Sequence, residues 1–181
     1  MADSDGVISS ERLDLALLSL DQLDLVAAGD SSRLAAELGA TIPADWASEV
    51  RGLAARRAQQ IRERPSDAPW LLRAIVLRPA DAGDERRAIG YLNFHAAPDE
   101  SGTAEIGYTL LPEARGHGYA IEAVRAAFEW ATRVHGIRRF RASVSPDNER
   151  SLNLIGRLGF HRTGEQWDPE DGLELVFELE L

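Results

Sequence analysis

The sequence predicts a mixed α/β fold of the α+β type, built on a mainly antiparallel sheet in a single domain of 181 residues. In several short segments apolar residues alternate with polar ones, which is the period of a β-strand. Other segments carry apolar residues at three- and four-residue spacing, which is typical of amphipathic helices. Short polar turns join neighbouring strand patterns, so consecutive strands are expected to run antiparallel.

Composition narrows the classes of protein that this chain fits. Apolar residues make up 44% of it and charged residues 28%, which is typical of a globular domain with a sizeable core. The absence of cysteine excludes disulfides, thiolate metal ligands and a covalent cysteine mechanism. The four histidines include no i, i+4 pair, so we expect no metal site. The net charge of −10 argues against nucleic acid as a partner and permits a cationic one.

The beginning of the chain is acidic and polar, without the apolar segment of a signal peptide. No stretch approaches the ~18 consecutive apolar residues of a membrane helix. We therefore expect a cytoplasmic protein without a membrane partner. One domain is expected to occupy residues 1–181, with residues 1–8 disordered.

The first half of the chain predicts one strand, three helices and then a hairpin. The strand covers residues 12–18. The helices lie within residues 20–66, over 21–28 with Asp21 as N-cap, from Ser31 or Ser32 to 38, and from 43 to about 64. The hairpin pairs apolar runs over 70–78 and 89–95 across a polar turn.

The second half begins with a strand from Glu105 that Pro112 ends, because proline donates no ladder hydrogen bond. A glycine-bearing turn and an amphipathic helix reaching about residue 131 follow. A strand over 139–144 leads to a helix that Asp147 or Asn148 caps and Gly159 closes in the left-handed conformation. An alternating strand over 173–181 ends the chain.

The turn from Arg115 to Ala120 is the stretch around which the other elements are organised. Its small residues leave backbone N–H groups free at the N-terminus of a helix, where the helix dipole also attracts negative charge. The turn therefore predicts an anion site. It is not a Walker A loop, because no Gly-Lys-Ser/Thr follows, and it sits too late in the chain for a dinucleotide-binding fingerprint.

Arg115-Gly-His-Gly-Tyr-Ala120 resembles the pyrophosphate loop of the GNAT superfamily of N-acetyltransferases, Arg/Gln-x-x-Gly-x-Gly/Ala. Glu105-Ile-Gly-Tyr108 before it and Glu-Ala after it resemble the branch that contains the ribosomal-protein N-terminal (alanine/serine) acetyltransferases. About thirty residues later, Asn148-Glu-Arg-Ser151 through Leu-Gly-Phe160 is similar to the second motif of the superfamily. Residues 105–160 would thus form an acetyl-CoA-binding core.

The resemblance implies a six- to seven-stranded sheet with helices on both faces and a V-shaped opening for the cofactor. The helices within 20–66 would shape the acceptor side. The backbone of Leu110 and Leu111 would bind the pantetheine arm, Asn148 would bond it and Ser151 would lie near the sulfur. Arg115 would support the loop or pair with a phosphate, and the pyrophosphate would bind the loop amides of Gly116, His117, Gly118, Tyr119 and Ala120.

Acetyl transfer to an amine needs a base, and a group that stabilises the leaving thiolate. Glu105 is the first candidate for the base, acting directly or through a water; the alternative is a carboxylate that merely pairs with an arginine. His95 is the second candidate, since histidine titrates near neutrality. Many relatives carry a tyrosine acid where this chain has Ile155, so Ser151 is the candidate acid; the alternative is an ordinary helix-end hydroxyl.

The function that this resemblance implies is transfer of an acetyl group from acetyl-CoA to a primary amine by direct attack. Both a protein or peptide N-terminus and a small amine stay open as acceptors, and the acidic balance favours a cationic one. A homodimer also stays open. The alternative function is a catalytically silent acyl-CoA-binding sensor or scaffold, which Ile155 keeps in play. The loop pattern disfavours a third hypothesis, a nucleotide-binding regulator.

Overall fold

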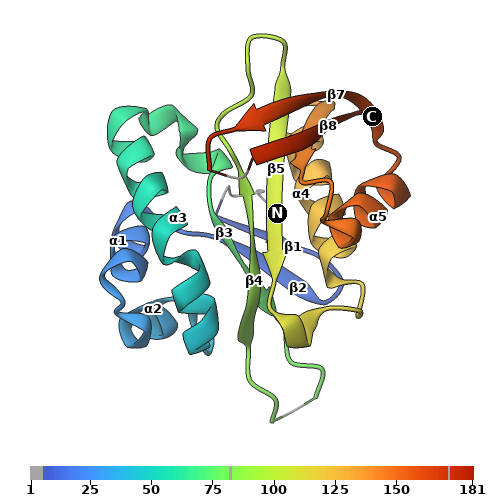
Figure 1. Ribbon diagram of the computed structural model, residues 1–181. Helices are drawn as coiled ribbons and strands as arrows, with labels where there is room; N and C mark the ends of the chain where they lie inside the picture. Colours follow the sequence, from blue (N-terminus) through green and yellow to red (C-terminus); the bar gives the residue numbers. More distant parts are fainter. Residues whose placement is uncertain (1–5, 82, 171) are drawn as a thin grey trace.

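An eight-stranded sheet forms the centre of the computed structural model, which describes residues 6–81, 83–170 and 172–181 (Figure 1). The strand order is β1-β2-β3-β4-β5-β6-β8-β7, and every neighbouring pair is antiparallel except β5 and β6. The strands are β1 Val7–Ser9, β2 Leu13–Leu17, β3 Arg73–Leu77, β4 Arg87–Phe94, β5 Thr103–Leu110, β6 Arg139–Val144, β7 His161–Asp168 and β8 Gly172–Glu180.

Helices cover both faces of this sheet, as the sequence predicted (Figure 1). One face is covered by α1, α2 and α3, which pack through Trp46 against Ala74 and Val76 of β3. The other is covered by α4 and α5, which pack against Ile106 and Phe140. The helices are α1 Leu20–Ala28, α2 Ser31–Leu38, α3 Ala44–Glu63, α4 Tyr119–His135 and α5 Glu149–Leu158, with 3₁₀ turns η1 Pro65–Trp70 and η2 Pro112–Ala114.

The mixed α/β class is confirmed, but the sheet has eight strands where six or seven were expected. Short β1 lies partly within the segment predicted to be disordered. Val7 pairs with Ala16 of β2, and Ile8 is buried in the core, whereas residues 1–5 lie outside the described part of the chain. The second strand that the sequence did not predict, after β1, is β7, a mostly exposed edge strand. Its polar sequence lacks apolar alternation because neither of its faces is deeply buried.

Two local predictions were wrong. The N-cap of α1 is Ser19 rather than Asp21: the Ser19 hydroxyl accepts from the Gln22 N–H at 3.3 Å, and the Gln22 side chain accepts from the Ser19 N–H at 3.0 Å. This reciprocal capping box satisfies two backbone donors at once. Trp70 lies in η1 rather than in β3, because Pro65 and Pro69 favour a tight turn there.

Candidate active site

The sheet opens where β5 and β6 separate. These two strands pair only over Thr103–Glu105 and Arg139–Arg141. Beyond that point β5 stays with β4 as far as Leu110, while β6 stays with β8 as far as Val144. The divergence is the V-shaped opening that was expected, and it leaves one edge of β5 without a strand partner beyond Glu105.

Below the opening, the chain turns through η2 into the N-terminus of α4. Gly116 and Gly118 both adopt the left-handed conformation, with φ of +82° and +81°. Gly118 is the N-cap of α4 and has no side chain with which to satisfy the first N–H groups of the helix. Those donors are therefore available to an anion at the positive end of the helix dipole.

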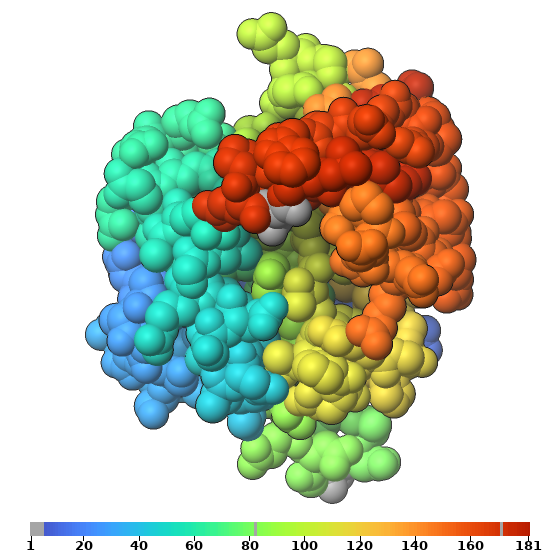
Figure 2. All heavy atoms as spheres, in the orientation of Figure 1, coloured from blue at the N-terminus to red at the C-terminus, as the bar shows by residue number. Residues whose placement is uncertain are grey.

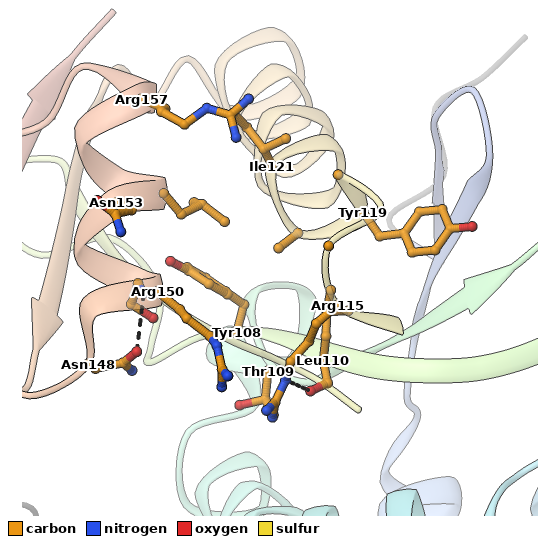
Figure 3. A pocket seen from close by; sticks show the side chains of 15 residues that line it. Tyr108, Thr109, Leu110, Arg115, Tyr119, Ile121, Asn148, Arg150, Asn153 and Arg157 are labelled. Carbon is orange, nitrogen blue, oxygen red and sulfur yellow. Dashed lines mark hydrogen bonds between the residues drawn. The ribbon is translucent and has the colours of Figure 1, made fainter. Parts of the chain in front are cut away.

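A cavity of ≈ 650 Å³ lies between this helix end, β5 and α5 (Figure 3). Three arginines line it, Arg115, Arg150 and Arg157, and no carboxylate of the described residues does. In a chain of net charge −10 this is a local concentration of positive charge suited to a polyanion. Eight of the predicted cofactor residues meet in its wall: Leu110, Arg115, Gly116, Gly118, Tyr119, Ala120, Asn148 and Ser151.

Two of the predicted cofactor residues do not line this cavity. Leu111 is buried in the core under α1–α3; its N–H donates to the Ile89 carbonyl and its own carbonyl accepts from Ala114. The backbone groups of Leu111 are therefore already used within the chain. The His117 carbonyl likewise accepts a hydrogen bond from Arg12 Nη1 at 3.1 Å, which ties the loop to the β1–β2 hairpin.

The other end of the cavity is formed by α5. Its N-cap is Asn148, whose side-chain oxygen accepts from the Ser151 N–H at 3.1 Å. The Ser151 side chain approaches the Tyr108 hydroxyl, and burial raises the pKa of Tyr108 above the usual value of a phenol. Ile155, one turn after Ser151, is 1% exposed and packs in the core. Its side chain therefore offers no donor to the cavity.

Glu105 lies at the point where the strands separate. Its Oε1 accepts from the Ser143 hydroxyl of β6 at 2.6 Å, and Nδ1 of His95, the residue that follows β4, lies 3.7 Å from the same oxygen. Gln166 of β7 donates to Ser143 Oγ at 3.2 Å and to Glu174 of β8 at 3.0 Å. Four neighbouring strands and the residue that follows β4 thus contribute to one polar cluster, defined here as the Glu105 cluster: His95, Glu105, Ser143, Gln166 and Glu174.

Desolvation lowers the pKa of His95, against the opposing attraction of Glu105. The Arg57 guanidinium lowers it further, whereas Glu174 and Asp168 act in the raising direction. The side chain of His95 is half-exposed. At neutral pH it is therefore an uncharged imidazole that faces several carboxylates.

A hollow lies on the surface of the molecule (Figure 2). Figure 2 shows this hollow between α3, the β7–β8 hairpin, α5 and the segment that leads into α4. A contact bridges its rim, since Arg56 Nη1 of α3 lies 3.9 Å from Glu170 Oε2 in the β7–β8 turn. The hairpin carries an exposed tryptophan, Trp167, beside Asp168.

Comparison with known proteins decides which family this site belongs to. The family model of the acetyltransferase (GNAT) domain matches residues 12–161. The chain belongs to this family. The match spans α1–α3, the loop before α4, and α5, and so includes both the cavity and the Glu105 cluster as far as Ser143.

Curated relatives of this GNAT domain match over part of its length. The uncharacterized N-acetyltransferase YoaA of Bacillus subtilis is 35% identical over 81 residues, which are 45% of this chain and 46% of that protein. The [ribosomal protein uS5]-alanine N-acetyltransferase of Escherichia coli is 37% identical over 82 residues, 45% of this chain and 42% of that protein. The chain thus spans less than half the length of these two relatives.

A solved structure shares the GNAT fold over nearly the whole chain. It is the Microcin C7 self immunity acetyltransferase MccE in complex with acetyl-CoA and AMP. The TM-score is 0.63 at 15% sequence identity, with 94% of this chain and 93% of that chain covered. At this identity the comparison supports the fold.

Sequence reasoning missed nearly half of the GNAT cavity wall. In α5, Leu152, Ile155 and Leu158 form the apolar stripe that faces the core, and the cavity is lined by the adjacent face of the same helix. The spacing of Arg150, Asn153 and Arg157 along one helix face was a signal that could have found it. The missed residues are Tyr108, Thr109, Ile121, Arg150, Asn153, Leu154 and Arg157.

The described residues contain no helix long and apolar enough to span a bilayer. Within the same residues, no group of three or more histidine, aspartate or glutamate side chains is arranged to bind a metal ion.

Proposed function

We propose that this GNAT domain transfers an acetyl group from acetyl-CoA to a primary amine. One observation supports this most strongly. An arginine-rich cavity at an uncapped helix N-terminus opens beside two diverging strands, and a carboxylate lies where they separate. The first feature suits a phosphorylated cofactor, and the second suits removal of a proton from an attacking amine.

The cavity residues fit coenzyme A. The pyrophosphate would lie at the N–H groups of α4 after Gly118, with Arg115 beside it. The edge of β5 that has no strand partner would bind the amides of the pantetheine arm as a neighbouring strand would. The Asn148 oxygen already caps α5, so its Nδ2 group is the donor that remains for the cofactor. Acetyl-CoA would supply the activated thioester.

Glu105 is proposed as the base, because the Ser143 hydroxyl holds its carboxylate at the mouth of the opening. An uncharged His95 on the same carboxylate oxygen would pass the proton on to solvent. The amine nitrogen would form a bond to the acetyl carbon, the carbon–sulfur bond would break and the electron pair would remain on sulfur. Ser151 is proposed to contact the sulfur from α5.

The acceptor is proposed to be a cationic amine, either a peptide N-terminus or a small molecule. Glu105, Glu174 and Asp168 all act to raise the pKa of His95, which indicates negative charge around the imidazole that an ammonium group would approach. Opposite charge favours such an approach. The name of the E. coli relative, which acts on an alanine of ribosomal protein uS5, supports a peptide N-terminus as the first class to test.

The experiment is release of free thiol from acetyl-CoA in the presence of peptide N-termini, polyamines, amino acids and aminoglycosides. The chain has no cysteine, so a thiol reagent detects only coenzyme A. Amine-dependent release would support the proposal and identify the acceptor class. Saturable acetyl-CoA binding with no release for any amine would favour the silent acyl-CoA-binding module. Absence of acetyl-CoA binding would overturn both functions.

Two further predictions concern the protein as a whole. All the residues of the proposed site come from one chain, so the reaction as proposed does not need a homodimer. Whether the protein forms a homodimer stays a prediction, which the molar mass from analytical ultracentrifugation would test. A cytoplasmic location likewise stays a prediction.

A further inference from the structure

The hydroxyl group of Tyr108 has an unusual environment. It is buried and makes no hydrogen bond of normal distance and angle to any described residue, while the neighbouring Ser151 side chain is close enough to lower its pKa, against the larger raising effect of burial. A buried polar group without a partner is unfavourable, and such groups in folded proteins commonly have a ligand or a catalytic role. In the described part of the chain, a few buried side-chain oxygen and nitrogen atoms lack such a hydrogen bond. Of these atoms, only the Tyr108 hydroxyl belongs to a residue that lines the cavity.

The position of Tyr108 on β5 relates this hydroxyl to the proposed base. Successive side chains of a strand point to opposite faces, so Glu105 and Tyr108, three residues apart, face opposite sides of the sheet. Glu105 contacts Ser143 and His95 on one side of the sheet, whereas Tyr108 faces α5 and the cavity (Figure 3). Both lie close to the separation of β5 from β6.

We infer that the Tyr108 hydroxyl donates a hydrogen bond to the sulfur atom of acetyl-CoA and stabilises the thiolate as it leaves. This inference rests on the proposed function. It places the proton acceptor on the amine side of the reacting carbon and a neutral donor on the thioester side.

The electron balance of the step is complete with these groups. The nitrogen lone pair forms the N–C bond, the C–S bond breaks, and its electron pair goes to sulfur. The excess proton on nitrogen goes to Glu105 and then to solvent. Tyr108 keeps its own proton and shares it in a hydrogen bond, and the thiolate takes up a proton from water when coenzyme A leaves.

The surroundings of Tyr108 suit a donor that keeps its proton. Burial raises its pKa, so the phenol stays neutral at physiological pH. Ser151 lies next to it and lines the same cavity, which provides a second hydroxyl for the sulfur. Ile155 provides none, because its side chain is in the core. Donors that are already oriented before the reaction stabilise developing charge most effectively.

The test compares Tyr108→Phe with the wild type in two measurements. The first is turnover, which should fall by about 10²-fold in the variant, as for the loss of one oriented donor, while the KM for acetyl-CoA changes little. The second does not depend on turnover. The thiol of bound coenzyme A, labelled with ¹³C on the carbon next to sulfur, is titrated by NMR, and its pKa should be lower in the wild-type complex than in the variant complex.

Tyr91→Phe is the matched control, since Tyr91 is on the other core face and does not line the cavity. It should match the wild type in both measurements. An unchanged thiol pKa in Tyr108→Phe would overturn the role of Tyr108 even if the wild type is an active enzyme. If the wild type turns over no amine, but the thiol pKa of bound coenzyme A is lower in the wild type than in Tyr108→Phe, the contact between Tyr108 and the sulfur is supported and the proposed function is overturned. A wild type that binds no coenzyme A would remove both.

Discussion

The Ser143 hydroxyl donates a hydrogen bond of 2.6 Å to Glu105 Oε1, from β6 to β5, next to the place where these two strands stop pairing. The donor is itself held by Gln166 of β7. A carboxylate at the mouth of an opening is otherwise free to rotate, and this contact keeps one of its oxygens fixed. In the proposed reaction, the carboxylate held in this way would take the proton of the amine.

Removing this contact should slow the reaction through the position of Glu105. We expect Ser143→Ala to lower kcat by about 10-fold, because a hydrogen bond to a charged group contributes about 1.5–3 kcal/mol and a released carboxylate samples unproductive positions. The KM for acetyl-CoA should not change. Ser143→Thr retains the hydroxyl and should restore most of the rate. An equal loss of kcat in Ser143→Ala and Ser143→Thr would indicate that the packing of the Ser143 side chain, rather than its hydrogen bond, maintains the rate.

Glu105→Gln removes the proposed base while it preserves shape. We expect kcat to fall by about 10²–10⁴-fold, the usual contribution of a general base, with acetyl-CoA affinity nearly intact. Steady-state kinetics and a direct binding assay separate the two quantities. Glu178→Gln is the matched control, because Glu178 pairs with Arg141 on the same sheet, outside the Glu105 cluster. An unchanged rate in Glu105→Gln would remove this residue from the mechanism.

Gly118→Asp tests the anion site. The substitution places a carboxylate at the N-cap of α4 and forces a side chain into a left-handed backbone conformation, φ +81°. We expect acetyl-CoA to bind at least ~100-fold more weakly, because like charges placed together cost several kcal/mol. Gly136→Asp is the control: Gly136 is also left-handed, φ +72°, but lies at the other end of α4. Calorimetry on both variants reports the difference.

Arg157 tests whether α5 contributes charge to cofactor binding. Arg157→Ala should weaken acetyl-CoA binding by about 3- to 10-fold at low salt, and the loss should shrink as salt rises, because exposed charge pairs are modest and screened. Arg33→Ala is the control, since Arg33 pairs with Glu37 on α2, far from the cavity. A salt-independent loss would indicate that Arg157 acts by packing.

The lowered pKa of His95 predicts that folding stability depends on pH. Burial lowers its pKa in the folded state below the 6.5 of an unperturbed histidine. As pH falls below about 6.5, the unfolded chain takes up a proton that the folded chain does not, so folding stability decreases with acidification. Above that pH the group is neutral in both states and contributes no pH dependence. Urea midpoints at pH 7.5 and 5.5 should therefore differ more in the wild type than in His95→Gln. An equal difference would assign the acid sensitivity to other groups.

The sequence predicted local features well. The helix over 149–158, its N-cap at Asn148 and its end at Gly159 follow from residues within one or two turns of each other. The uncapped start of α4 is likewise a property of the six consecutive residues from Arg115 to Ala120. The predicted N-cap of α1 was wrong by two positions, because Asp21 and Ser19 both suit a helix start and only the reciprocal bond with Gln22 distinguishes them.

The sequence predicted the residues of the candidate site less completely than it predicted local structure. Glu105 and His95 were recognised as candidates, but the hydrogen bond from Ser143 joins residues 38 positions apart and depends on the parallel register of β5 with β6. Gln166 lies on an edge strand whose polar sequence has no strand pattern. No periodicity in the sequence distinguishes a cavity-lining tyrosine such as Tyr108 from one that only packs.

The sequence by itself therefore determined the glycine-bearing loop before α4, the order of most of the elements and the family. These depend on backbone conformation and apolar spacing, which neighbouring residues control. The tertiary structure alone decided where β5 leaves β6, which side chains meet at that point and which faces of β5 carry Glu105 and Tyr108 to opposite sides of the sheet. The reason is that strand register and divergence are set by packing between distant segments, and a register shift of one residue would exchange the two faces.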